Sequence, residues 1–347
     1  MWVMVTLVAV VLQALRTSMQ QKLRSQLSIT AAGFVRYFYG APLALAAVGI
    51  AVIGFGQTLE APPATFWVTV TAAGVAQIVG TVALITAFDR RGFAVGTVYA
   101  KTEVLQVAVF SALVLHEQLG LWGWAGAGVC LVGVAWLALA RPRPVPGGSA
   151  VLGGSTVLGG PALLGGPAVL GGSAVKTDGL ATQKRQGTQN LGPIDSASVF
   201  RVDAALGFGL LAGAGFALAS VWIRASSKSL GEHPAVCRAL LTLAAMNTIQ
   251  MVINGTQMLL TNADDVRAVV RTWRSSSVVG LLSVCGSAGW ALAVTLQTAT
   301  KVRTLGQVEL LLTFAISHRF LGERHRRNEF LASALVVAGV GIVLALG

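Results

Sequence analysis

Two acidic residues lie inside apolar stretches of this 347-residue chain. Glu103 belongs to the stretch "VYAKTEVLQV", and Glu309 belongs to "GQVELLLTFA". An ionised carboxylate within a membrane costs roughly 3 kcal/mol, so it must face a cavity, find a partner or hold a proton. We therefore expect the two glutamates to bind protons or a cationic group of a substrate. The alternative interpretation is that they pair with buried cations and only fix helix packing. The possible partners are Arg36, Lys101, Arg238 and Arg303.

Polar residues at helical spacing accompany the two glutamates. Tyr99, Glu103 and Gln106 follow the i, i+4, i+7 spacing, which places them on one face of a helix. Further stripes with this kind of spacing are Gln77 and Thr81, and Ser283, Ser287 and Trp290. We expect these stripes to line a shared pathway through the membrane.

Arg36 and Arg238 each lie one or two turns after the start of an apolar stretch. Their long side chains could extend to the membrane surface. Alternatively, each guanidinium group binds a carboxylate through two parallel hydrogen bonds. Both interpretations stay open, and both arginines are included among the candidate substrate or proton ligands. Glu117 and Glu323 are interpreted instead as capping or loop residues.

The composition is that of a polytopic membrane protein. Hydrophobic residues make up 54% of the chain and charged residues 11%, with a mean hydropathy of +0.73; soluble domains carry about a quarter charged residues. The net charge of +12 lies in short loops rather than on one basic face, so we expect no nucleic-acid partner. The three cysteines are far apart and form no metal-binding motif, so no metal or cofactor is expected.

Ten apolar stretches are long enough to cross a bilayer as helices, which takes about 20 residues. They cover residues 1–20, 30–54, 65–88, 93–115, 120–140, 203–225, 234–259, 276–299, 302–320 and 328–346. The first is interpreted as a retained span rather than a signal peptide. Residues 141–200 contain the repeat "VLGGSTVLGGPALLGGPAVLGG", whose glycine content predicts a flexible linker.

The two halves of the chain are related by an internal duplication. Shifting the second half back by 206 positions aligns Glu309 with Glu103 and Glu323 with Glu117. With five spans per copy, the second copy enters the membrane from the opposite side, as in many secondary transporters. The sequence thus predicts an all-α integral membrane protein, with ten transmembrane helices in two inverted five-helix repeats at 1–140 and 201–347.

Both copies resemble the EamA repeat of the drug/metabolite transporter superfamily. The resemblance rests on "VLHEQLGLWGWAGAGVCLVGVAWLA" (114–138), on "RFLGERHRRNEFLASALVVAGVGIVLA" (319–345) and on Arg36 in "AAGFVRYFYGAPLALA". It implies a ten-helix fold with a central cavity, and export of small metabolites or drugs. Two features depart from the family pattern: the first helix has "LQALRTSMQ" in place of a Trp-Gly pair, and the linker is longer. Gly126, Gly128 and Gly133 predict a fifth helix packed closely on a neighbour.

We expect a secondary transporter that exports small metabolites such as amino acids by alternating access, with proton coupling inferred from the glutamates. It would lie among the lipids of the cell membrane (the inner membrane of a bacterium) as a monomer or homodimer. Alternatives are a multidrug or cation exporter of the same fold, an intramembrane enzyme that uses Ser287, and a non-transporting membrane partner protein. Basic loops after the odd-numbered spans, including Arg16, place both termini outside, whereas the family resemblance implies both inside.

Overall fold

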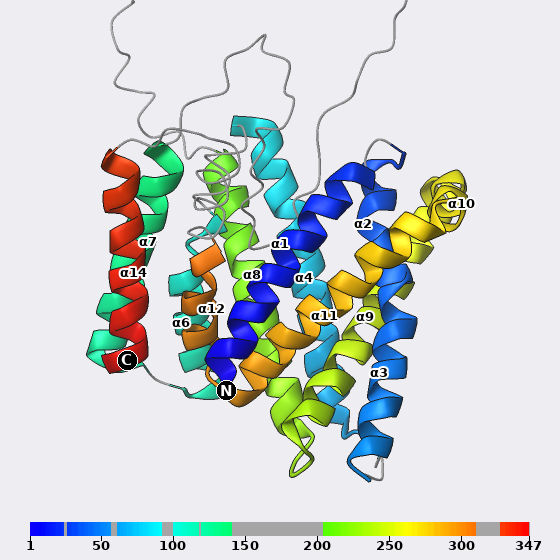
Figure 1. Cartoon of the computed structure of the whole chain (residues 1–347), viewed down its shortest axis with the longest axis horizontal. Coiled ribbons are helices and arrows are strands. Elements are labelled where there is room, and N and C mark those ends of the chain that lie inside the picture. Colours follow the sequence, from blue (N-terminus) through cyan, green and yellow to red (C-terminus); the bar gives the residue numbers. More distant parts are fainter. Residues whose placement is uncertain are drawn as a thin grey trace, which may run out of the picture.

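The structure is a computed structural model that describes residues 1–23, 26–56, 61–91, 100–117, 119–140, 204–309 and 327–346. Every element in these ranges is a helix (Figure 1). The first half contains α1 (Trp2–Leu23), α2 (Ile29–Phe38), α3 (Gly40–Gly54), α4 (Ala64–Arg91), α6 (Glu103–Leu115) and α7 (Leu121–Ala140). The second half contains α8 (Ala204–Ser229), α9 (Ala235–Thr261), α10 (Ala263–Arg271), α11 (Trp273–Leu296), α12 (Ala299–Gly306) and α14 (Arg327–Leu346). The predicted linker, 141–200, lies outside the described residues.

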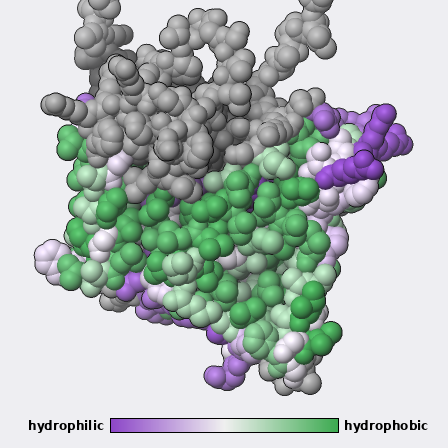
Figure 2. Space-filling model, in the orientation of Figure 1, coloured by the Kyte–Doolittle hydropathy of each residue, from purple (hydrophilic) through white to green (hydrophobic). Residues whose placement is uncertain are grey.

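The helices carry apolar side chains on their outer surface, as expected for contact with lipid. Figure 2 shows hydrophobic residues over most of the visible face and hydrophilic residues gathered at one corner, where α10 lies. Five helical stretches are long and apolar enough to cross a membrane by length and composition. They are Thr30–Gly54, Ala64–Leu84, Leu206–Ser229, Ala235–Thr261 and Trp273–Leu296. The predicted class, an all-α membrane protein, is therefore supported, whereas the arrangement of ten inverted spans stays a prediction.

Several predicted spans differ from the helices observed. The stretch 30–54 is divided at Tyr39 into α2 and α3. The described part of 93–115 has a turn at residues 101 and 102, so α6 begins only at Glu103. The described part of 302–320 has α12 from Ala299 to Gly306, followed by a turn at Gln307.

A short helix, α10, was not predicted. Asp264 and Asp265 lie in its first turn and Arg271 in its last, which is the charge order that a helix dipole favours. Val269 is buried against residues of α2, α9 and α11. Because this segment is polar overall, a search for apolar stretches cannot detect it.

The packing of the two halves is reciprocal. α1 packs on α11, and α4 packs on α8. Under the shift of 206 positions, α1 corresponds to α8 and α4 to α11, so each of these contacts is the counterpart of the other. α7 also packs on its own counterpart, α14, at one end of the bundle, and α3 packs on its counterpart, α9 (Figure 1). Halves related by a two-fold axis would produce this pattern.

Small residues allow the closest of these contacts. A Cβ atom on Gly215 of α8 would lie 2.6 Å from the Cα of Gly80 in α4. A Cβ on Gly133 of α7 would lie 2.7 Å from a backbone nitrogen of α14, and Gly126 is similarly enclosed, so the predicted close packing of this helix is confirmed for both. The prediction is wrong for Gly128, which has no atom of a neighbour within 4 Å of that position.

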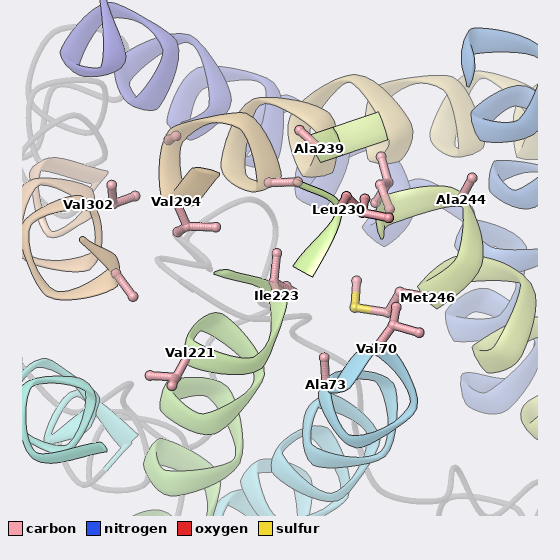
Figure 3. Packing of buried hydrophobic residues seen from close by; sticks show 14 of the residues in the cluster. Val70, Ala73, Val221, Ile223, Leu230, Ala239, Ala244, Met246, Val294 and Val302 are labelled. Atoms are coloured by element: carbon pink, nitrogen blue, oxygen red, sulfur yellow. The ribbon is translucent and has the colours of Figure 1, made fainter. Parts of the chain in front are cut away.

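The largest buried cluster lies between the halves. Figure 3 shows Val70 and Ala73 of α4 beside Met246 of α9, with Ile223 of α8 and Val294 of α11 completing the cluster. These side chains hold α4, α8, α9 and α11 together around the polar groups described next.

Candidate functional site

A cavity lies between the two halves, with about 620 Å³ of empty space. It is lined by residues of α1, α2, α4, α8, α9, α11 and α12. These residues are Gln13, Arg16, Arg36, Gln77, Phe216, Ile223, Thr242, Leu243, Met246, Ser287, Trp290, Ala291 and Arg303. The lining therefore combines an apolar wall from the second half with polar groups from both halves, a combination typical of small-molecule sites.

Both predicted glutamates lie where a helix is interrupted. Glu103 is the first residue of α6 and follows the turn at residues 101 and 102. Glu309 follows the turn at Gln307, where α12 has ended. In the sequence alignment of the two halves, a shift of 206 positions pairs Glu103 with Glu309 and residue 101 with Gln307. The two interruptions therefore lie at corresponding positions of the two halves. Non-helical backbone at membrane depth is tolerated where protein or a cavity surrounds it, and interrupted helices form many transporter sites.

Glu103 is 3% exposed and forms an ion pair across the two halves. The Nη1 atom of Arg303, in α12, lies 3.1 Å from Glu103 Oε1. Arg303 also donates from Nε to the hydroxyl of Ser220 at 2.7 Å, and its guanidinium lies 5.0 Å from the centre of the Trp290 ring. Arg303 thus joins Glu103 to the cavity wall, and it is one of the four partners considered for the glutamates from the sequence.

Glu309 is 2% exposed and is joined to the same wall. Gln13 Nε2 donates a long hydrogen bond of 3.4 Å to Glu309 Oε2, and Gln13 Oε1 accepts one of 3.0 Å from the indole of Trp290. Arg16, Lys101 and Arg303 lie near enough to Glu309 to interact with it electrostatically. A continuous series of contacts therefore runs from Glu103 through Arg303, Trp290 and Gln13 to Glu309.

Gly306 makes room for the ring at the centre of this series. A Cβ atom at this position would lie 2.5 Å from Trp290 Cη2, a distance that real Cβ contacts do not reach. The indole of Trp290 therefore packs directly on the last turn of α12, beside the interruption that precedes Glu309.

Four of the predicted ligands line the cavity: Arg36, Gln77, Ser287 and Trp290. Arg36 is 6% exposed, so its guanidinium does not extend to the membrane surface. Gln77 accepts a hydrogen bond of 2.7 Å from Gln250 Nε2, which holds α4 against α9.

Other predicted ligands face elsewhere. Gln106 donates to the backbone oxygen of Leu210 in α8, at 3.2 Å, and Thr81 donates to a carbonyl of its own helix. Ser283 and Arg238 are not among the residues that line the cavity. Tyr99 lies outside the described residues. Helices that carry the predicted polar faces therefore line the cavity, but only some of the predicted residues do so.

The sequence analysis missed Gln13, Arg16 and Thr242 as cavity residues. Arg16 was interpreted as a loop charge that sets orientation, but it lies within α1 and is 3% exposed. The correction has a physical reason: α1 continues to Leu23, so Arg16 is not at its end. The spacing of Gln13 and Arg16, one turn apart in an apolar stretch, was the signal available in the sequence.

A helical membrane protein with a buried polar cavity between two corresponding halves is the class that this geometry defines. Residues 1–139, the first half of the chain, match the model of the EamA-like transporter family, in agreement with the resemblance seen in the sequence. The match and the apolar helices together indicate a multi-pass membrane protein.

Among solved structures, 24 chains are similar to this one. One of them, titled only "Crystal structure of protein", is 14% identical and superposes with a TM-score of 0.63 over 99% of this chain and 97% of its own. At that identity the likeness shows a shared fold alone. None of the curated proteins compared with the chain matches it.

Proposed function

We propose that the protein is a secondary transporter of the cell membrane that exports a small metabolite, such as an amino acid, by alternating access. The observation that carries the proposal is the series of contacts from Glu103 to Glu309, which borders the cavity and crosses between the halves. Interrupted helices at corresponding positions of two repeats are a feature of such transporters.

Alternating access requires contacts between the halves to exchange. The Arg303–Glu103 ion pair and the Trp290–Gln13 hydrogen bond each join the first half to the second. Both lie at the cavity, so a substrate that enters can compete for the same donors and acceptors. The proposal is that substrate binding loosens these contacts and allows the halves to rock about the site.

Proton coupling, if it occurs through one glutamate, fits Glu309 better than Glu103. Glu103 is committed to an ion pair at 3.1 Å. Glu309 accepts its hydrogen bond from the neutral amide of Gln13, a cavity residue, and lies near three cations. A proton on Glu309 would remove the negative charge that balances these cations and so change how the cavity binds a charged substrate.

The test is flux in proteoliposomes that contain the purified protein, measured for amino acids and related metabolites with and without a pH gradient. We expect Glu309→Gln to abolish the effect of the gradient while exchange of substrate across the membrane continues. The matched change Glu103→Gln is expected to weaken all flux, because it breaks the ion pair with Arg303.

Two results would contradict separate parts of the proposal. Gradient-driven flux that survives in Glu309→Gln contradicts proton coupling through this residue. Absence of flux for every metabolite, from a folded and correctly inserted protein, contradicts transport itself. Three arginines at the cavity disfavour the alternative of a cation exporter, since a cationic substrate would meet like charges.

A further inference from the structure

We infer that the transported substrate is an organic anion whose negatively charged oxygens bind between Arg16 and Arg36. The inference rests on the proposed transport function and names the substrate class of the same cavity. From the sequence alone, Arg16 is interpreted as a loop charge, and carboxylate binding is one of two interpretations of Arg36; the pairing of the two arginines at one site comes from the structure.

Positive charge exceeds negative charge around the cavity. Three arginines, Arg16, Arg36 and Arg303, line it, and its described lining includes no carboxylate. Glu103 and Glu309 instead contact the lining residues Arg303 and Gln13. All of these charged side chains are nearly inaccessible to water, with Arg303 the most exposed at 15% of its side chain. Arg303 pairs with Glu103 and Arg16 interacts with Glu309, so the charge that a bound anion would balance is that of Arg36. Burying a charge is strongly unfavourable when its counter-charge is missing.

Arg36 has hydrogen-bond donors available for that anion. Its Nε and Nη1 atoms are buried and have no hydrogen-bond partner within the described part of the chain. The guanidinium also lies 5.1 Å from the centre of the Tyr37 ring, and this contact does not use the hydrogens on Nε and Nη1. Because Arg36 also lines the cavity, a ligand there can reach donors that the protein itself does not satisfy.

Arg16 and Arg36 lie close enough to each other for their like charges to interact. Both line the same cavity, so a ligand in the cavity can contact both of these like charges. An oxyanion between the two guanidinium groups would turn this repulsion into two attractions. Guanidinium groups bind carboxylate and phosphate oxygens through planar, paired hydrogen bonds, so both groups of ligands share the required chemistry.

The remaining lining indicates what else the substrate carries. Phe216, Ile223, Leu243 and Met246 form an apolar wall to the same cavity. This wall would exclude water from a hydrocarbon group and gives no partner to a second charge. The substrate class is therefore an oxyanion attached to an apolar body, rather than an inorganic ion or a cation.

The experiment compares ligands of one shape and different charge on the purified wild-type protein in detergent. Benzoate and phenyl phosphate supply the two kinds of oxyanion, benzamide is neutral, and benzylamine is a cation. The midpoint of thermal unfolding is recorded against ligand concentration, because a ligand of the native state raises it. We expect at least one anion to raise the midpoint with saturation, and the amide and amine to have no effect at the same concentration. The stronger of the two anions identifies the oxyanion group.

The variant Arg36→Gln is expected to bind the anion about 10- to 100-fold more weakly, the factor that one charge-assisted hydrogen bond supplies. Arg36→Lys keeps the charge but loses the planar pair of N–H donors, so we expect a loss of anion affinity between those of the wild type and Arg36→Gln. The control is Arg267→Gln, which removes the same charge from a side chain that is 82% exposed and pairs with Asp264. Binding by this control should equal that of the wild type.

The outcomes separate this inference from the proposed function. If benzylamine binds, or if no anion binds to the folded wild type, the inference is overturned, and flux of another substrate would still support transport. If an anion binds in an Arg36-dependent manner but none crosses a liposome membrane, the anion site stands and transport fails. Equal weakening by Arg267→Gln and Arg36→Gln would also overturn the inference, because the effect would then come from net charge.

Discussion

Two groups of charged residues join the halves of this protein, and they differ in how fully their charges are satisfied. The first, the Glu117 group, consists of Glu117, Arg224 and Lys228. Arg224 Nε lies 2.8 Å from Glu117 Oε1, and Arg224 Nη1 donates to the backbone oxygens of Val294 and Gln297, each at 2.6 Å. Lys228 pairs with the same carboxylate. In this group the carboxylate has two cations, and Arg224 also binds carbonyls at the end of α11.

The second group lies at and beside the cavity and consists of Arg16, Arg36, Lys101, Glu103, Arg303 and Glu309. Here the cations outnumber the carboxylates, and Arg36 has donors without a partner among the described residues. The comparison teaches that burial alone does not distinguish a structural charge from a ligand-binding one. The difference lies in whether the protein itself supplies every partner.

The largest effect is expected from Arg224→Met. This change leaves the Glu117 carboxylate, 14% exposed, with Lys228 alone, and removes the donor to the end of α11. Breaking a buried pair in this way lowers the free energy of unfolding by about 3–5 kcal/mol. Thermal unfolding of the purified protein measures this loss of stability. The control is Arg267→Met, which changes an arginine on the exposed surface. If Arg224→Met and Arg267→Met were equally stable, the Glu117 group would not be structural, and the two groups would not differ in this way.

Arg36→Met should act in the opposite direction. Without ligand, Arg36 is a buried cation with unsatisfied donors, and an apolar side chain of similar length removes that cost. We expect the free energy of unfolding of the ligand-free protein to rise by about 1–3 kcal/mol, the cost of an unsatisfied buried group. The same unfolding measurement checks it, together with flux, which should fall. A stability loss comparable to that of Arg224→Met would show that Arg36 is structural.

Gly306→Ala changes the cavity group without changing any charge. The added methyl group would clash with Trp290, so the ring must move away from Gln13 and Arg303. Overpacking of this kind lowers the free energy of unfolding by about 1–2 kcal/mol, and we expect flux to fall as well. Gly341→Ala in α14, where nothing lies within 4 Å, is the matched control and should retain wild-type flux. Unchanged flux in Gly306→Ala would show that the position of Trp290 is unimportant.

The smallest effect is expected from Trp290→Phe. This variant keeps an aromatic ring beside Arg303 but loses the hydrogen bond to Gln13. A loss of about 1 kcal/mol in the free energy of unfolding is expected, as for one neutral hydrogen bond. If Gln13 transmits the state of Glu309, the pH dependence of flux should also change. An unaltered pH profile would exclude that route.

The sequence predicted the class of fold and the residues at the centre of the cavity group. Both glutamates were identifiable because a carboxylate in an apolar stretch is rare, and because one shift of 206 positions aligns them. Arg36, Gln77, Ser287 and Trp290 followed from spacing on helices that do line the cavity. These signals depend on residue type and on helical period, and the sequence contains both.

The interruptions of the helices could not be predicted in the same way. Residues 101 and 102 and Gln307 interrupt stretches whose average hydropathy remains high, so a window of about 20 residues passes over them. Arg16 was misplaced because loop charge and cavity charge look alike near the end of an apolar stretch. The direction of Gln106 could not be predicted because a single polar face can contact both a cavity and a neighbouring helix; in the structure Gln106 packs on α8.

The excess of positive charge at the cavity also bears on what could drive transport. A site lined by three arginines that exports a single oxyanion, as proposed, would move negative charge out of a cytoplasm that is electrically negative relative to the exterior. The electrical gradient favours that movement by about 2.3 kcal/mol per 100 mV for each charge. The resting voltage would then add to the pH gradient that acts through Glu309 as a driving force for export.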